Sequence, residues 1–498
     1  MVNKKLGILF LASVILAFFA GFFTERILPS SPQTNTTDMF DYIIESFDRY
    51  YYYEIDDEEV HDAFISAMEA TINKIAEKNG DPYTRLLATP LASGPTDDEK
   101  FVGIGISFLF EENDIRIGYV YPQGAAHLKL FPYDLIIGLK QLDQMIYFKD
   151  LEDTDDVLEL ISGVQGESKE FIVKDADGNE NIVSISYQEI LTPTAYSKDL
   201  GESNIAYIKI ESFASSSETS PGTAQIFQNT LNALEQTILQ GENKTLILDL
   251  RDNPGGALTA LHNQGVSQLI PGITQQLLTR SLEAPLFTMI PKSGTVESFF
   301  GALAEKKPYD IKVLVNENSA SAAEVLAAAL QTKGGYELYG RPTYGKGVYQ
   351  NQVRLQDINN IRYYLVFTEG KWFYDGDKNV ADTPLVVNEL PKTGIKSLDA
   401  PVYVYEMSYD HVYEELVNYQ AFFNLYYGLE GIDQLRTDGY FDQKTKDRVQ
   451  AFNLEYGIAK DYISLETSRK VHEIYMNYLL DLTKDDELQT LVSIIKNS

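Results

Sequence analysis

The spacing of apolar residues changes along the chain and predicts regions with different folds. From Met39 to about Ala88, apolar positions recur every three or four residues, which predicts helices that end near Gly80. Residues 101–190 carry short apolar runs such as IRIGYVYP and EFIVKD, which predict strands, with DDVLELISGV as one helix among them. We therefore expect a helical N-terminal region over residues 39–98 and a compact β-rich domain over residues 99–190.

The middle of the chain alternates between strand and helix patterns. IAYIKIESF, KTLILDL and DIKVLVN are typical of buried strands, and TAQIFQNTLNALEQTILQ between the first two has a helical period. Strands that alternate with helices predict a mostly parallel sheet. The fold class is therefore α/β multidomain, with an α/β core over residues 191–400 and a helical, tyrosine-rich domain over residues 401–498.

The N-terminal stretch Leu6–Phe23 is apolar except for one serine, and two lysines precede it. As a helix it would span about 27 Å, enough to cross the hydrocarbon core of a bilayer. A cleaved signal peptide is the alternative, although its apolar core is normally shorter and no good cleavage site follows here. We predict an anchor over residues 1–28 with a short cytoplasmic N-terminus, a linker over residues 29–38, and a single-pass protein of the cell membrane whose bulk is extracytoplasmic.

Composition narrows the range of partners and of chemistry. The 73 acidic residues against 41 basic ones give a formal charge of -32, which disfavours nucleic acid as a partner. Because cysteine is absent, thiol catalysis, disulfides and cysteine-based zinc sites are excluded. The five histidines show no metal-ligand spacing, so we expect no metal and no cofactor. A serine nucleophile in this chain would therefore need a base other than histidine.

Two loops of the α/β region have the composition of a catalytic site. In DLRDNPGGAL, Gly255 and Gly256 lack side chains, so their amides can approach a ligand oxygen as an oxyanion hole requires; a plain strand-ending turn is the alternative. In NENSASAAEVLAAAL, Ser321 and Glu324 form a capping-box pattern at the start of a helix. The alternative is that Ser321 is a nucleophile, with the amide of Ala322 pointing at the same oxygen.

A third loop, RPTYGKGVYQ, carries Lys346 between two glycines and Gln350 four residues later. A surface lysine in such a loop is usually solvated, but a buried lysine can take a proton from serine. Lowering its pKa from about 10.4 to roughly 7 or 8 costs about 4 kcal/mol, which a desolvated pocket can impose. With no histidine near Ser321 or Lys346, the residues favour a Ser-Lys dyad.

Five motifs in a fixed order, DPYTRLL, GIGISF, DLRDNPGG, SASAAE and YGKGVYQ, resemble those of the carboxyl-terminal processing peptidases, which are tail-specific serine proteases of the S41 type. The resemblance covers about residues 39–400. In that family the serine is the nucleophile, the lysine is the general base, and the glutamine orients the lysine. The resemblance implies these roles for Ser321, Lys346 and Gln350, and places the oxyanion donors in the NPGG turn and at the amide after the serine.

The same resemblance identifies residues 99–190 as a PDZ domain. Such domains bind an extended peptide as an added strand and hold its terminal carboxylate on backbone amides. The loop that matches this function consists of Gly103, Ile104, Gly105 and Ile106.

The C-terminal stretch LRTDGYFDQKTKDRVQAFNLEYGI, residues 435–458, resembles the small helical peptidoglycan-binding domain. Its matched apolar positions, among them Phe441, Val449 and Phe452, are expected to be core residues. The match therefore indicates a fold more strongly than sugar binding, and a docking or dimerising role is the alternative.

Together these features predict a membrane-anchored extracytoplasmic serine endopeptidase that cleaves proteins near their C-termini, with the PDZ domain gating access. The predicted partners are protein or peptide C-termini, the membrane through the N-terminal helix, peptidoglycan as a candidate, and a second copy of the chain in a homodimer. Two alternatives remain: a non-catalytic adaptor that holds partners at the envelope, and a hydrolase of cell-wall peptides.

Overall fold

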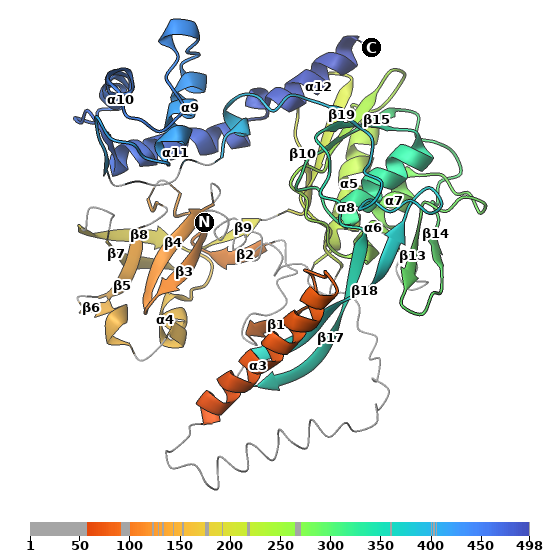
Figure 1. Ribbon diagram of the computed structural model, residues 1–498, viewed down its shortest axis with the longest axis horizontal. Coiled ribbons are helices and arrows are strands. Elements are labelled where there is room, and N and C mark those ends of the chain that lie inside the picture. The colour runs from red at the N-terminus through yellow and green to blue at the C-terminus, as the bar shows by residue number, and fades with distance from the viewer. Residues whose placement is uncertain are drawn as a thin grey trace.

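The computed structural model shows an α/β core, a separate β-rich domain and a group of C-terminal helices (Figure 1). The structure describes residues 57–497, except for residues 91–99, 122–123, 128, 132–133, 143, 152–153, 175–178, 192, 217–219, 264–269, 359–360, 400, 402–403 and 405.

A six-stranded sheet forms the centre of the α/β core. Strand β10 is antiparallel to β11, and the remaining neighbours pair in parallel. Every residue of β11 and β12 is buried, as expected for a sheet covered on both faces. The strands, in spatial order, are β10 (Ala195–Ser197), β11 (Ile205–Ile210), β12 (Thr245–Asp249), β15 (Asp310–Val315), β16 (Glu337–Gly340) and β19 (Val387–Glu389).

Helices cover the two faces of this sheet differently. On one face, alternate strand residues such as Ile208 and Leu248 belong to a core that includes residues of α5 and α8. On the other face, residues such as Ile247 and Leu314 contact the last helix of the chain, α12. The helices of the core are α5 (Gly222–Glu235), α6 (Leu258–Leu261), α7 (Ile273–Leu277), α8 (Ala322–Ala329) with the π-helical turn η2 (Leu330–Gly334), and α12 (Asp486–Asn497).

The region predicted as helical, residues 39–98, contains a strand as well as a helix. Its described part begins with α3 (Asp57–Lys78), which is followed after a turn by β1 (Arg85–Pro90). The helix ends at Lys78, close to the predicted end near Gly80, whereas Arg85–Pro90 forms a strand with residues 361–366, a partner that local periodicity cannot reveal. The antiparallel sheet so formed contains β1, β18 (Ile361–Phe373), β13 (Phe287–Pro291), β14 (Glu297–Phe299) and β17 (Val348–Ile358).

The β-rich domain has the predicted strands and helix. The run FVGIGISFLF, however, is interrupted at Gly105, whose φ is +86°. A Cβ atom at this position would lie only 2.5 Å from the Cα atom of Gly124, so only glycine fits. Strand β2 (Lys100–Gly103) pairs with β9 (Gln188–Leu191). The larger sheet and its helices are β3 (Ile106–Glu111), β4 (Asp114–Val120), β5 (Leu135–Gln141), β6 (Gln144–Tyr147), β7 (Ser168–Lys174), β8 (Glu180–Ser186), η1 (Phe148–Asp150) and α4 (Thr154–Ile161).

The C-terminal part is helical around an aromatic core. Phe441, Val449 and Phe452 are fully buried there, as the sequence pattern predicts. The last helix, α12, leaves this group and lies against the α/β core (Figure 1). The elements of this part are η3 (Ile395–Ser397), β20 (Glu406–Met407), α9 (Leu416–Tyr426), η4 (Gly431–Asp433), α10 (Gln443–Glu455), β21 (Ile463–Ser464), α11 (Leu465–Leu480) and η5 (Leu482–Lys484).

The predicted membrane anchor, residues 1–28, lies outside the residues that the structure describes. Among the described helices, none has both the length and the apolar composition needed to cross a bilayer. Helix α3 has 22 residues, but acidic and basic side chains recur along it. The prediction of a single-pass protein at the cell membrane is therefore corrected, because no described helix supports it.

Candidate active site

The three loops singled out in the sequence meet at one edge of the central sheet. They follow β12, β15 and β16, which are neighbouring parallel strands, so their carboxyl ends lie side by side. Ligands of open α/β sheets bind at this edge. Backbone hydrogen bonds join the loops directly: the Ala320 amide donates to Asn253 O at 2.9 Å, and the Tyr344 amide donates to Ser319 O at 3.1 Å.

Ser321 occupies a strained turn between β15 and α8. Its φ of +56° and ψ of -118° are rare for a residue with a side chain, and such backbone costs about 1–3 kcal/mol. The Ser321 amide donates to a carboxylate oxygen of Glu324 at 2.9 Å, as in a capping box, but the serine side chain makes no cap hydrogen bond. The hydroxyl is thus not consumed by capping the helix that it precedes.

Lys346 is held by contacts to both its side chain and its backbone. Its Nζ atom donates to Gln350 Oε1 at 2.6 Å and lies 4.6 Å from the centre of the Tyr83 ring. The indole of Trp372 donates to the Lys346 carbonyl at 2.8 Å. Among the contacts of the described residues, no hydrogen bond joins Lys346 to Ser321.

The environment of Lys346 favours its neutral form. Burial lowers the pKa of the amine to about 8, and the nearby cation of Arg85 acts in the same direction. The carboxylates of Glu324 and Asp81 oppose this shift without reversing it. Asp81 also shapes the DPYTR turn, because it accepts hydrogen bonds from the Tyr83 amide at 2.9 Å and from the Thr84 hydroxyl at 2.5 Å.

The glycine turn packs directly against the serine. A Cβ atom at Gly255 would lie 2.8 Å from the Cβ atom of Ser321 and 3.0 Å from the Ala322 amide nitrogen. The Gly255 amide itself donates to Asn253 Oδ1 at 2.8 Å. The amides of Gly256 and Ala322 have no hydrogen-bond partner within the part of the chain that the structure describes. These two amides are therefore available to a ligand, whereas that of Gly255 is engaged.

Glu324 connects the serine turn to the lysine loop, which the sequence did not reveal. Its fully buried carboxylate accepts hydrogen bonds from the amides of Ser321 (2.9 Å), Lys346 (2.9 Å) and Gly345 (2.7 Å). Burial raises the pKa of the Glu324 carboxyl, while these amide donors act to lower it. The capping-box pattern signals only the Ser321 contact, since the contacts to the lysine loop span more than twenty residues.

The DLRDN turn is fixed to the serine loop through side chains that were likewise not recognised in the sequence. The Asp252 amide donates to Asn316 Oδ1 at 2.8 Å, and Asn316 Nδ2 donates back to Asp252 Oδ1 at 2.9 Å. Asp252 has a φ of +62°, which tight turns of this kind require. No local sequence signal pairs these two residues, because the two strands that carry them are separated by a long connection.

The predicted peptide-binding loop of the β-rich domain borders a cavity. The residues predicted to hold a terminal carboxylate, 103–106, line a cavity of about 280 Å³. Leu158 and Ile161 of α4 also line the cavity, and most of its remaining lining is apolar. The cavity therefore suits an apolar side chain next to a loop of backbone amides.

Known proteins that are similar to this chain include peptidases of related kinds. Residues 204–381 match the model of peptidase family S41. Over 472 residues the chain is 27% identical to the carboxy-terminal processing protease CtpB of Bacillus subtilis, covering 92% of this chain and 89% of that protein. It is also 27% identical over 392 residues to CtpA of the same organism, covering 76% of this chain and 75% of the relative.

A solved structure, the photosystem II D1 C-terminal processing protease, aligns with 71% of this chain and 88% of its own at 20% identity and a TM-score of 0.38. The family match and the curated relatives, without the solved structure, show that residues 204–381 match peptidase family S41 and that the chain is a homologue of the carboxy-terminal processing proteases.

Proposed function

We propose that this chain is a serine endopeptidase that cleaves proteins near their C-termini, with Ser321 as the nucleophile and Lys346 as the general base. The observation that carries the proposal is the pair of loops at the sheet edge: a strained serine turn and a buried lysine of lowered pKa, both hydrogen-bonded to Glu324. A lysine that only served solubility would have no need of this environment.

The chemistry follows from these groups. Neutral Lys346 takes the proton of the Ser321 hydroxyl as its oxygen attacks the scissile carbonyl. The amides of Gly256 and Ala322 are the available donors for the oxyanion. The lysine then gives its proton to the leaving amine, and the acyl-enzyme is hydrolysed by water that the same lysine deprotonates. Lys346 Nζ donates to Gln350, and a neutral amine that donates in this way still has a lone pair with which to accept the serine proton.

We further propose that residues 99–190 are the PDZ domain that selects substrates. The support is the cavity lined by residues 103–106, which combines backbone amides with apolar walls. A peptide added as a strand beside this loop would place its last side chain in the cavity and its carboxylate at the amides. Occupation of this domain would then gate access to Ser321.

The remaining parts of the chain carry less specific proposals. We keep residues 191–400 as the protease core and 401–498 as the peptidoglycan-binding-like domain, except that α12 packs with the core. The residues that carry the second resemblance, Phe441, Val449 and Phe452, are buried and support its fold. Binding to peptidoglycan and formation of a homodimer stay predictions.

The proposal is tested by incubating the purified chain with an unstructured protein and identifying the products by mass spectrometry. Ser321→Ala and Lys346→Ala should each abolish cleavage while circular dichroism stays unchanged. Ser293→Ala and Lys378→Ala, which replace surface residues, are the matched controls and should cleave normally.

Cleavage that persists in both active-site variants would rule out the dyad. A folded wild type that binds peptides without cleaving any would favour the adaptor alternative. Release of products from isolated wall peptides but not from the protein would favour the hydrolase of wall peptides.

A further inference from the structure

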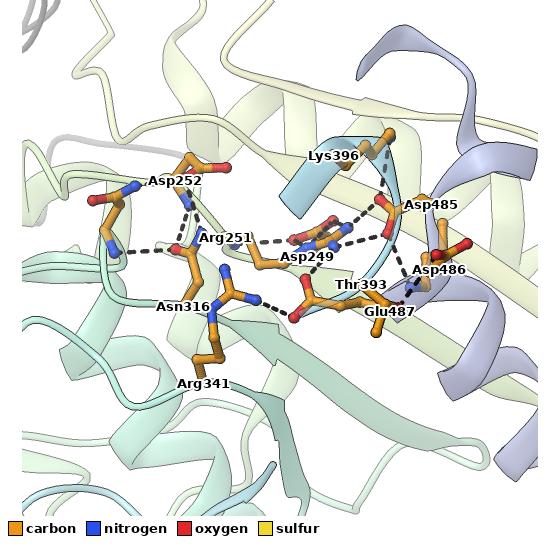
Figure 2. Close-up of polar contacts among 12 residues, drawn as sticks. Asp249, Arg251, Asp252, Asn316, Arg341, Thr393, Lys396, Asp485, Asp486 and Glu487 are labelled. Atoms are coloured by element: carbon orange, nitrogen blue, oxygen red, sulfur yellow. Dashed lines mark hydrogen bonds and ion pairs between the residues drawn. The ribbon is translucent and has the colours of Figure 1, made fainter. Parts of the chain in front are cut away.

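A buried cluster of ion pairs joins the C-terminal end of the chain to the turn after β12 (Figure 2). At its centre, Arg251 donates through Nε and Nη2 to Asp249, at 3.0 and 2.6 Å. The same guanidinium donates through Nη2 and Nη1 to Asp485, at 2.8 and 3.1 Å, and through Nη1 to Glu487 at 3.0 Å. Arg251 is thus held between one acid of its own turn and two acids from the far end of the sequence.

Further cations hold the two C-terminal acids in place. Lys396 Nζ lies 3.3 Å from Asp485 Oδ2. Arg341, at the start of the lysine loop, pairs with Glu487 and also with Glu317, at 2.7 Å. Glu487 therefore bridges Arg251 to Arg341, in the loop that leads to Lys346. Figure 2 shows the side chains of Arg251, Glu487 and Arg341 next to one another.

Two acids of the cluster, Asp249 and Asp485, are ionised at neutral pH. Burial alone would raise the pKa values of Asp249 and Asp485, but the Arg251 guanidinium holds both below their usual range. Neutralising the C-terminal acids would leave Arg251 with Asp249 as its one acidic partner, beside the cation of Lys209.

Docking of α12 also has an apolar part that does not involve these acids. Its apolar side chains, Leu488, Leu491, Val492 and Ile495, are buried against residues of the sheet such as Ile247. Asp485 precedes the helix and Glu487 lies in its first turn. Substitution of the acids therefore leaves the apolar side chains of this contact unchanged.

Arg251 lies in the loop that carries the proposed oxyanion donor. On one side of it, Leu250 O accepts from the Ser319 hydroxyl at 2.8 Å; on the other, Asn253 O accepts from the Ala320 amide at 2.9 Å. A displacement of Arg251 is therefore passed to the serine turn and to Gly256. Misplacement of a reacting group by about 1 Å can lower a rate by about 100-fold.

We propose that Asp485 and Glu487 are positioning residues of the active site: they fix Arg251, and Arg251 fixes the loop that presents the Gly256 amide. This inference rests on the proposed protease function. Its consequence is that the catalytic loop of the core is completed by the C-terminal helix, so the core without that segment is a poor catalyst.

The test uses the full chain with the double substitution Asp485→Asn and Glu487→Gln. The matched control is Asp486→Asn, an acid of the same turn whose carboxylate accepts from Thr393 at 3.2 Å instead of from Arg251. We expect kcat of the double variant to fall by roughly 30- to 100-fold with KM within about threefold, whereas the control stays within about twofold of wild type. Hydrogen exchange should accelerate in residues 250–256 but not in 488–497.

Wild-type kcat together with wild-type exchange of residues 250–256 in the double variant would overturn the inference. If exchange shows that α12 has undocked, Arg251→Lys is measured instead. Lysine keeps the charge but lacks the planar fork of five donors with which Arg251 contacts all three acids, so a large loss of kcat supports the inference and an unchanged kcat overturns it. If Ser321→Ala cleaves as fast as the wild type, the proposed function is contradicted. Hydrogen exchange of residues 250–256 would still test whether Asp485 and Glu487 position the loop.

Discussion

One carboxylate oxygen of Glu324 accepts hydrogen bonds from the backbone amides of both Ser321 and Lys346, each at 2.9 Å. The proposed nucleophile and the proposed base belong to different loops, and this oxygen sets the distance between their backbones. Since Glu324 is fully buried, water cannot substitute for it as an acceptor.

Replacing Glu324 with glutamine should therefore impair turnover without removing side-chain volume. The amide nitrogen of glutamine cannot accept, so at least one of the three amides loses its partner. Loss of a hydrogen bond to a buried charge costs about 2 kcal/mol, which corresponds to roughly a 30-fold change. We expect kcat to fall by this order, measured with a fluorogenic peptide. Glu337→Gln, at the surface, is the control, and equal kcat for both variants would contradict the role of Glu324.

The activity should rise with pH around the pKa of Lys346. Because the reaction needs the neutral amine, the active fraction is small well below pH 8 and grows as pH passes through the pKa of about 8. A profile of kcat/KM between pH 6 and roughly 9.5 should show a single rising limb. Lys346→Arg should be inactive across it, since a guanidinium stays protonated. A profile that is flat from pH 6 upward would contradict lysine as the base.

A carboxylate at position 350 should move this profile to higher pH. Gln350→Glu would place a negative charge at the atom that now accepts from Lys346 at 2.6 Å, which stabilises the ammonium form. An opposite charge at such a distance raises a lysine pKa by about 1–3 units. The neutral variant Gln350→Asn should lower the rate without an alkaline shift, so identical midpoints for the two variants would disprove the contact.

Peptide binding to the β-rich domain should depend on a free C-terminus. With Ser321→Ala to prevent cleavage, fluorescence anisotropy should show that a peptide with a free carboxylate binds at least about tenfold more tightly than its amidated form, as expected for hydrogen bonds to a charged group.

Leu158→Asp should weaken this binding, because it places a negative charge in the wall of the cavity. Leu142→Asp, in the same domain but almost fully exposed and away from the cavity, is the matched control. Equal affinity for both peptide forms would show that residues 103–106 do not bind a carboxylate.

The sequence by itself determined the elements that a local pattern of apolar residues identifies. The continuous apolar runs predicted β11, β12 and β15, and the helical period predicted α5 and the start of α8. The candidate residues Ser321, Lys346 and Gln350 were also named from sequence, through the composition of their loops and the resemblance to the carboxyl-terminal processing peptidases. The hydrogen bond from Lys346 to Gln350 spans only four residues, so these two residues are close to each other along the sequence as well as in space.

Only the tertiary structure decided which distant segments meet. The pairing of β1 with β18, the docking of α12 on the core and the contact of Glu324 with the lysine loop leave no periodic signal, because each depends on which strands are neighbours. The same holds for the glycine turn, where composition could not distinguish the engaged amide of Gly255 from that of Gly256. Hydrophobic periodicity reports whether a residue is buried, whereas the partner that it meets is set by the arrangement of the whole chain.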